Sequence, residues 1–492
     1  MLILLKINDS GRNQTEKINE VAPGFHTMAP DTRLTSAPTQ TNPNEGKMEP
    51  RAPTTLANIN MVRTILYKPT IFGTMLTITH VCLGNFALFS FAQKTKSFGL
   101  IWMVFFCILV AIINYWAIMR SFAASIKCTD CNYSDITEQF LGKKASKILN
   151  ILIIGYSFLC MMYLVSLTFP MIGRIIKILL YNNQYQSYNI FLQEKWGKGF
   201  IKYPFFITIG FCIFVINYFK FIRLKFVGIF RIIAISFCIL ILIIECNSYY
   251  NFYKSEIYNK NDKNTYPNWS HLKYAFTTKM EFFKGLCILF ASYTCMPIMF
   301  PIFEGFKIQE NPLKKTQMSV ILGILLTTAL SIISMICSYL INPYSPEELI
   351  IFRKNKNNSK DILMIIINFI LIICILLTIP RYYLMLKINF KTLFFKKNKK
   401  LSDKLNNIFT FIFCFGSALA SIHFDHYLSF LSYIGGFFSV FINYLFPVLV
   451  YVKSSGKNIK YWINLIQIIF ACFLCIIGII GGISTLFDDI RN

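Results

Sequence analysis

About eleven apolar blocks divide the chain, and each is long enough for a helix to cross a lipid bilayer. A helix needs about 20 apolar residues to span a hydrocarbon core of roughly 30 Å. Charged residues make up only 15% of the chain, against about 25% in soluble domains. The sequence therefore predicts an all-α polytopic membrane protein. The expected spans are residues 71–92, 98–121, 146–179, 203–220, 226–246, 283–306, 317–341, 361–386, 405–423, 428–452 and 460–486.

The net charge of the chain is strongly positive, at +26. In a soluble protein such a balance would suggest binding to nucleic acid. Here Lys and Arg lie mostly in the loops between apolar blocks, and no nucleic-acid-binding motif accompanies them. Basic loops are typical of the cytosolic side of a membrane, where they also attract anionic lipids. We therefore expect the lipid bilayer, and no nucleic acid, as a partner, with the N-terminal tail in the cytosol.

Two of the apolar blocks carry residues that interrupt a helix near the middle of the membrane. The first block contains "LGN" (Leu83–Asn85), and the sixth contains "CMPIMFP" (Cys295–Pro301). Pro297 and Pro301 each remove a backbone donor and clash with the preceding turn. The two blocks are the first helices of two five-helix halves. Interrupted segments at matching positions indicate the substrate site of a transporter built from inverted repeats.

An interrupted helix in lipid needs partners for its freed backbone groups, because each unpaired group costs several kcal/mol. A substrate carboxylate can meet the N–H groups at the start of the outgoing half-helix. A substrate ammonium or a coupling cation can meet the freed carbonyls. The breaks therefore predict a site for a zwitterion of the size of an amino acid. The candidate substrate-binding residues are Cys82, Leu83, Gly84, Asn85, Tyr163, Tyr293, Thr294 and Pro297.

Several segments resemble the amino acid/auxin permease family of the amino acid–polyamine–organocation superfamily. The first span of this family carries G-x-G-x-L-x-L-P-x-A followed by a Gly. This chain has "GNFALFSFAQKTKSFG", with Gly84 and Gly99 but without the second Gly and the Pro. The sixth-span segment "FASYTCMPIMFPIFEGFKIQENP" is similar to the family pattern that ends in Glu-x-x-Lys and Pro, matched by Glu304, Lys307 and Pro312. The segments "LLTIPRYYLMLK" and "YLSFLSYIGGFFSVFINYLFPVLVYVK" resemble the family's eighth and tenth spans.

The resemblance covers roughly residues 65–486 and implies eleven spans, of which the first ten form two inverted five-helix repeats. It also implies amino acids as substrates. Residues 1–64 are polar and rich in Pro, Thr and Asn, so we expect a disordered cytosolic tail there. Within the transporter domain (65–486) we expect a first repeat at about 71–246, a second at about 283–452 and an additional helix at 460–486, followed by a short C-terminal tail at 487–492.

Three ionisable residues are candidates for coupling or gating. His80 lies inside the first span, and an ordinary histidine pKa of about 6.5 suits proton coupling; the alternative is a neutral histidine bonded to a neighbouring backbone. Glu304 and Arg381 lie near the cytosolic ends of the sixth and eighth spans and are candidates for a gate. For Glu304 the alternatives are a proton site and a structural salt bridge or cap. For Arg381 the alternative is snorkelling to the headgroups. We expect coupling to protons, with sodium coupling and uniport as alternatives.

The sequence favours a secondary active amino acid transporter that works by alternating access. Neutral or aromatic substrates are favoured only because no acidic residue lies deep in a span. Motifs such as HExxH, GxSxG and the phosphate-binding loop are absent, so we expect no enzyme activity, cofactor or metal. We interpret the lone CxxC of Cys128 and Cys131 as structural.

The alternative function is a membrane amino acid sensor that signals through its tail. The expected location is the plasma membrane or an acidic vacuole- or lysosome-like membrane.

Overall fold

The computed structural model describes most of the apolar part of the chain, and within it every regular element is helical. The predicted N-terminal tail (1–64) lies outside the described residues, and so does Cys131 of the CxxC pair. The described residues are 70–85, 87–91, 95, 98–128, 132–181, 191–196, 198–219, 224–260, 279–307, 309–341, 349–350, 362–395, 403–423, 427–455 and 461–491.

The first half of the chain begins with a short helix that does not continue through the membrane. Helix α2 (Ile71–Cys82) is capped at its start by Thr70, whose hydroxyl accepts a hydrogen bond from the Gly73 amide at 3.0 Å. Two 3-10 segments follow it, Leu83–Asn85 and Ala87–Ser90. The other helices of this half are α4 (Leu100–Ser125), α5 (Tyr133–Leu141), α6 (Lys143–Ile176), α8 (Gly199–Phe219) and α9 (Leu224–Lys260).

The second half repeats this pattern, because its first span is also divided. The two parts are α10 (Lys279–Ser292) and α11 (Met296–Lys307). Three further helices follow, α12 (Pro312–Ile341), α13 (Ile362–Phe394) and α14 (Asp403–Ala420). The tenth span runs from α15 (Tyr427–Tyr433) through π-helical segments η9 (Ile434–Ser439) and η10 (Phe441–Leu445) to α16 (Phe446–Ser454), and α17 (Tyr461–Arg491) extends into the predicted C-terminal tail.

The helices agree with the spans expected from the sequence. Ten helices of the described part are long and apolar enough to cross a membrane, and α2 with its 3-10 continuation supplies the first span. The prediction of an all-α polytopic membrane protein is confirmed. The third span occupies 39 residues, Lys143–Tyr181, and so exceeds the length that a bilayer requires, as expected for a tilted helix.

One expected loop contains a helix instead. The sequence between the second and third spans has α5, which is short and amphipathic rather than membrane-spanning. Tyr133 at its start is buried, and its hydroxyl donates to the carbonyl oxygen of Ile442 in η10 at 2.7 Å. The hydrogen bond docks α5 onto the tenth span.

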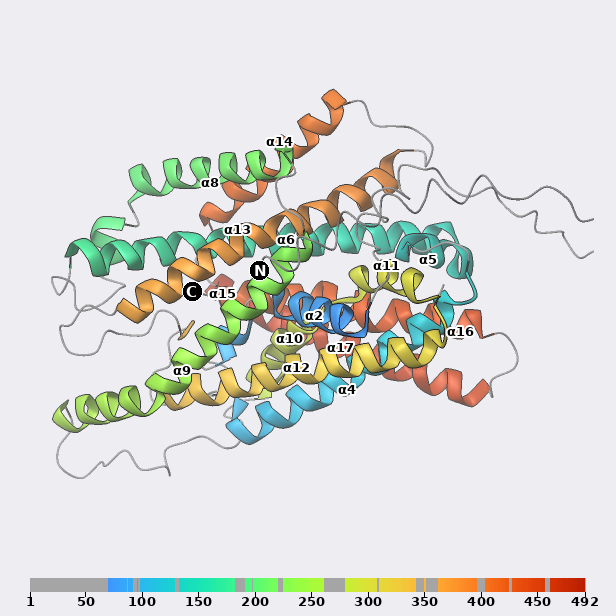
Figure 1. Cartoon of the computed structure of the whole chain (residues 1–492), viewed down its shortest axis with the longest axis horizontal. Coiled ribbons are helices and arrows are strands. Elements are labelled where there is room, and N and C mark those ends of the chain that lie inside the picture. Colours follow the sequence, from blue (N-terminus) through green and yellow to red (C-terminus); the bar gives the residue numbers. More distant parts are fainter. Residues whose placement is uncertain are drawn as a thin grey trace, which may run out of the picture. The chain divides into compact units, whose positions relative to one another are not determined.

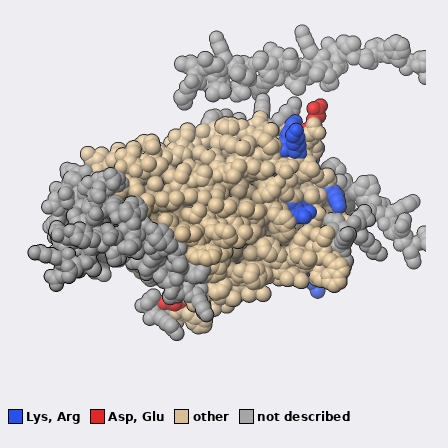
Figure 2. All heavy atoms as spheres, turned by 90° about the horizontal axis from the view of Figure 1, so that it is seen from below, with Lys and Arg blue, Asp and Glu red and all other residues tan. Residues whose placement is uncertain are grey.

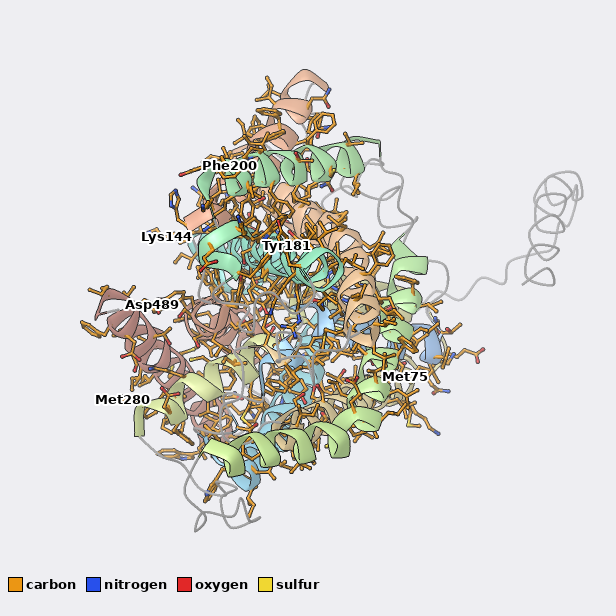
Figure 3. The ribbon with its side chains drawn as sticks, turned by 90° about the vertical axis from the view of Figure 1, so that its left-hand side faces the viewer. Met75, Lys144, Tyr181, Phe200, Met280 and Asp489 are labelled. Atoms are coloured by element: carbon orange, nitrogen blue, oxygen red, sulfur yellow. The ribbon has the colours of Figure 1, made fainter. Side chains whose placement is uncertain are left out.

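The outer surface of the helices is apolar, as lipid contact requires. Many large apolar side chains are exposed, among them Phe200 at 74% and Trp462 at 70%. Phe200 and Met280 lie on the outside of the bundle in Figure 3. Figure 2 shows a face on which the described residues are almost all uncharged, with Lys and Arg gathered toward one end. This distribution is typical of a protein whose charged residues stay near the membrane surface.

Both interrupted spans pack against several other helices. Helix α2 packs against α9 and α12, whereas α10 packs against α17 and η9. Helix α13 lies along α6 and also contacts α9 (Figure 1). These contacts bring helices from both halves of the chain to the two breaks.

Two backbones approach each other closely between α10 and the tenth span, at Gly435. A Cβ atom on this glycine would lie 1.7 Å from the carbonyl oxygen of Cys287, far inside contact distance. Small residues permit such close helix packing in membranes. Glycine at position 435 is therefore a requirement of the packing.

We predict that Gly435→Ala lowers the stability of the detergent-solubilised protein, whereas Gly416→Ala does not. The added methyl group at position 435 must push two backbones apart, and overpacking of this kind costs about 1–3 kcal/mol or more. Gly416 in α14 has no atom within 4 Å of its Cβ position, so alanine there should gain up to about 1 kcal/mol from helix propensity. The melting temperatures of the two purified variants measure the difference. Equal melting temperatures would contradict the packing described here.

Candidate functional site

The break in the first span leaves backbone groups that side chains of other helices satisfy. Helix α2 ends at Cys82, and the chain then turns through 3-10 geometry. The carbonyl oxygen of Leu83 accepts a hydrogen bond from Nη2 of Arg231 in α9 at 3.1 Å. The carbonyl oxygen of Leu88 accepts one from the Ser334 hydroxyl of α12 at 3.2 Å. The side chain of Asn85 lies outside the described part.

The break in the sixth span is bridged by one amide side chain. Asn443, in η10 of the tenth span, donates through Nδ2 to the Tyr293 carbonyl oxygen at 3.2 Å. Its Oδ1 accepts from the Met296 amide at 3.3 Å. One residue therefore pairs the carbonyl of the first non-helical residue with the first amide of α11.

The sixth-span break lies earlier in the chain than the sequence predicted. The expected interruption covered Cys295–Pro301, but the non-helical residues are Tyr293–Cys295. Pro297 lies in the first turn of α11, where an amide N–H has no intrahelical partner and proline is well tolerated. Pro301 lies inside α11, which continues to Lys307. Pro297 thus starts the second half-helix instead of interrupting it.

Each break receives a polar side chain from the last helix of its own five-helix half. Arg231 comes from the fifth span, and Asn443 comes from the tenth. Each is the last helix of its five-helix half, and each supplies a side chain to the broken first helix of that half. The agreement supports an internal repeat at the level of individual hydrogen bonds.

The predicted pocket residues Tyr293 and Thr294 use their hydroxyl groups within the protein. The Tyr293 hydroxyl lies 2.7 Å from the Thr328 hydroxyl of α12 and 3.5 Å from the Cys107 thiol of α4. The Thr294 hydroxyl donates to the Phe290 carbonyl at 2.9 Å, within the end of α10. Both side chains therefore hold the shape of the break, and both are buried.

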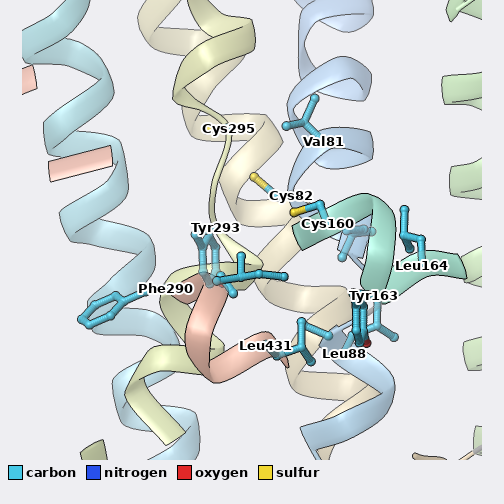
Figure 4. Packing of buried hydrophobic residues seen from close by; sticks show 14 of the residues in the cluster. Val81, Cys82, Leu88, Cys160, Tyr163, Leu164, Phe290, Tyr293, Cys295 and Leu431 are labelled. Carbon is cyan, nitrogen blue, oxygen red and sulfur yellow. The ribbon is translucent and has the colours of Figure 1, made fainter. Parts of the chain in front are cut away.

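Two cysteine thiols connect the first break with the second. The Cys82 and Cys295 thiols lie near enough to interact electrostatically, and Asn114 of α4 donates to the Cys295 sulfur at 3.7 Å. Figure 4 shows Cys82 beside the segment that carries Cys295. The sequence-predicted residues of the two broken spans thus meet in one buried region. Tyr163 of α6 belongs to the same buried cluster, with its ring 6.2 Å from that of Phe430.

Gly84 is the point on which three polar side chains converge. A Cβ atom placed on it would lie 3.2 Å from the Tyr382 hydroxyl, 3.3 Å from Nη2 of Arg381 and 3.4 Å from Nη2 of Arg231. Tyr382 and Arg231 are fully buried, and Arg381 is 7% exposed. The absence of a side chain at position 84 is what lets these groups approach the broken backbone.

The convergence places two positive charges close together. Both Nη2 atoms lie within 3.4 Å of one point, so they are at most about 7 Å apart. Two unit charges at that separation repel by about 2 kcal/mol at an effective dielectric constant of about 20. Among the residues whose side chains the structure describes, no Asp or Glu is buried. The centre of the bundle is therefore positively charged.

His80 borders the same region. Its ring packs on Gly228 of α9, whose Cβ position lies 3.6 Å from the ring carbon Cγ. Its Nδ1 atom is buried and has no hydrogen-bond partner. The charges that act on the imidazole are those of Arg231 and Arg381. His80 thus lies beside the two arginines, one helix turn before the break.

Arg381 and Glu304 do not form the gate pair considered from the sequence. Arg381 lies at the first break, where its guanidinium also stacks 5.0 Å from the Tyr382 ring centroid. Glu304 lies half-buried in α11, and no ion pair joins it to Arg381 in the part of the chain that the structure describes. The position of Arg381 in the sequence suggested a membrane surface because "LMLK" and a basic loop follow it closely. Helix α13 continues to Phe394, and this leaves Arg381 deep in the bundle.

Sequence reasoning missed three residues that the structure places at the breaks: Arg231, Tyr382 and Asn443. Arg231 carries a usable signal, because it is a cation inside the predicted fifth span, and intramembrane charges usually face a functional interior. Asn443 is a polar residue inside the tenth span, but many such residues only bond their own helix. Nothing in the sequence distinguishes Tyr382 from the other tyrosines.

Comparisons with known proteins bear on the family and the fold of this chain. The model of one protein family, described as transmembrane amino acid transporter protein, matches residues 68–487. No curated protein matches the sequence significantly. Among solved structures, the inward-facing conformation of Mhp1 is similar with a TM-score of 0.51 and 11% identity over 84% of this chain and 88% of that chain.

Two further solved structures are similar at lower TM-scores. Mhp1, a nucleobase-cation-symport-1 family transporter, in a closed conformation with bromovinylhydantoin bound, gives 0.49 at 12% identity over 84% of this chain and 90% of that chain. A manganese transporter from Eremococcus coleocola gives 0.45 at 10% identity over 85% and 94%. The likeness to inward-facing Mhp1 shows the fold. The predicted five-plus-five architecture with broken first and sixth spans is confirmed.

We predict that Asn443→Ala destabilises the protein more than Asn389→Ala does. The first change removes the partner of two buried backbone groups at the sixth-span break, and each unsatisfied group costs about 1–3 kcal/mol. Asn389 donates only to Met385 of its own helix, at 2.7 Å, so its loss should cost little. Melting temperatures of the purified variants test this. Equal melting temperatures of Asn443→Ala and Asn389→Ala would show that the two hydrogen bonds of Asn443 do not stabilise the break.

Proposed function

We propose that this chain, which belongs to the transmembrane amino acid transporter family, is a secondary active carrier that moves amino acids by alternating access and is driven by protons. The proposal rests on one observation: the breaks of the first and sixth spans lie in one buried region, and side chains of other helices form hydrogen bonds with both. Broken helices at matching positions of two repeats build substrate sites near the membrane midplane. The two halves then rock around this fixed site.

The first break supplies the groups that an amino acid requires. We assign the substrate carboxylate to the segment Cys82–Asn85, where a 3-10 turn follows α2 and leaves backbone groups outside the helical pattern. Because Gly84 has no side chain, the polar ends of Tyr382, Arg381 and Arg231 can lie close to this backbone. Tyr163 and the Tyr293–Pro297 segment enclose the substrate from the other helices. The buried region holds no carboxylate side chain among the described residues, which disfavours substrates with a cationic side chain.

The contacts at the first break favour protons over sodium as the coupling ion. Freed carbonyls of a broken helix coordinate sodium in transporters that use it. Here the Leu83 carbonyl is already bonded to Arg231, so it is not available to coordinate sodium. His80 has an unpartnered Nδ1 atom in the same region and is our candidate for the proton carrier. The membrane is either the plasma membrane or an acidic vacuole- or lysosome-like membrane, both of which maintain proton gradients.

We expect proteoliposomes containing the full chain to accumulate amino acids when an inward proton gradient is imposed. The measurement is uptake from a labelled amino acid mixture, with and without the gradient, and with a sodium gradient in its place. Accumulation under the sodium gradient alone would overturn proton coupling while leaving transport intact. Binding of amino acids without any uptake would overturn transport itself and favour a sensor.

We also predict that His80→Gln abolishes accumulation driven by the proton gradient but retains exchange of substrate across the membrane. The amide of glutamine preserves a polar group but does not titrate in this range. His423 ends the 3-10 segment after α14 and is exposed, so His423→Gln is the matched control and should behave as the wild type. If His80→Gln still accumulates substrate under the proton gradient, the proton is carried elsewhere.

A further inference from the structure

We propose that the site selects amino acids with a carboxylate in the side chain, the aspartate and glutamate class, through the two arginines at the first break. This inference rests on the proposed amino acid transport and adds the substrate class to it. It replaces the sequence-based preference for neutral or aromatic substrates. That preference considered only the missing acidic residues and did not include the two arginines that meet at Gly84.

The first step of the argument is the charge of the buried region. Every charged side chain that is buried in the described part is a cation. Lys284 is paired with Asp488 and Glu281 near the membrane surface. Arg231 and Arg381 instead converge on Gly84, beside the backbone of the broken helix. An occupant with net negative charge is favoured there over one that is neutral.

The second step is the set of donors left open. Arg381 has no hydrogen-bond partner at Nε or Nη1, and the Tyr382 hydroxyl has none either. Both residues are more than nine-tenths buried, so water does not readily replace a missing partner. The open N–H groups at Nε and Nη1 lie on different edges of the guanidinium, so each can donate one charge-assisted hydrogen bond to a carboxylate oxygen. The adjacent phenol can donate a third.

The third step is the number of carboxylates. A neutral amino acid carries one carboxylate and one ammonium, and so adds no net charge to a site that holds two arginines. Its single carboxylate is already assigned to the freed backbone of the Cys82–Asn85 segment. A second carboxylate on the side chain gives Arg381 and Tyr382 their own acceptor and brings the net negative charge that the region lacks.

The test compares ligands that differ only in charge. Glutamate and glutamine have nearly the same shape, as do aspartate and asparagine. We expect the purified full-length protein to bind glutamate at least tenfold more tightly than glutamine, measured by competition at constant ionic strength. The comparison is repeated with chloride replaced by a bulky sulfonate, because a small inorganic anion would also supply negative charge.

Variants assign the selectivity to Arg381. We expect Arg381→Gln to bring the glutamate-to-glutamine affinity ratio close to one, while Arg381→Lys retains a preference of several-fold because the charge remains. Arg174→Gln is the matched control, since Arg174 is also a buried arginine but lies near the end of α6. The glutamate-to-glutamine affinity ratio of Arg174→Gln should equal that of the wild type. Melting temperatures show which variants are folded. If Arg381→Gln is unfolded, the selectivity of Arg381→Lys is compared with that of the wild type instead.

Three outcomes overturn the inference. Glutamine that binds as tightly as glutamate to the wild type excludes selection by charge. A glutamate preference that is lost only when chloride is present identifies the arginines as an inorganic anion site. A preference that survives in folded Arg381→Gln places the selectivity elsewhere. These results are distinct from failure of the proposed function, in which no amino acid of any class is taken up.

Discussion

A broken helix inside a membrane is permitted only where something other than water satisfies its backbone. This requirement governs the centre of the molecule. At the first break the Leu83 carbonyl is bonded to Arg231, and at the second Asn443 pairs with both Tyr293 and Met296. Because each unpaired group would cost several kcal/mol in hydrocarbon, these three hydrogen bonds determine which helices must surround the site. The fifth and tenth spans are thereby tied to the first and sixth.

The same requirement explains why so much of the site was predictable, and where prediction stopped. Apolar block lengths specify the spans, and Gly84 and Pro297 lie in the two spans that break. Proline alone does not identify a break, since Pro170 of α6 and Pro380 of α13 lie inside continuous helices. Which side chains satisfy the freed groups depends on contacts between residues far apart in the chain, such as the 148 positions between Leu83 and Arg231. The depth of Arg381 was misjudged for a related reason, since it depends on how far α13 extends beyond the membrane.

The polar residues near the breaks divide into two groups by what they contact. Tyr293, Thr294 and Asn443 have partners within the protein for groups that hold the break in shape. His80, Arg381 and Tyr382 retain buried atoms without partners. Natural proteins rarely leave such atoms unsatisfied, so each one needs an explanation, and at these positions a bound ligand or a proton supplies one. Burial and polarity alone, which the sequence shows, do not separate the two groups.

The two arginines differ in a way that bears on the transport cycle. Arg231 is tethered to the protein and bonded to a carbonyl of the first break, so it supports that break whether or not substrate is present, unlike a coupling ion that dissociates. Arg381 has open donors, so its burial is compensated only when an acceptor arrives. The Arg381 charge is therefore not compensated by a partner within the protein, and an anionic group that binds beside it lowers this cost. A ligand that stabilises the closed state more than the open one shifts the equilibrium toward closure. An anionic substrate favours closure of the two halves only if the closed state brings its carboxylate closer to Arg381.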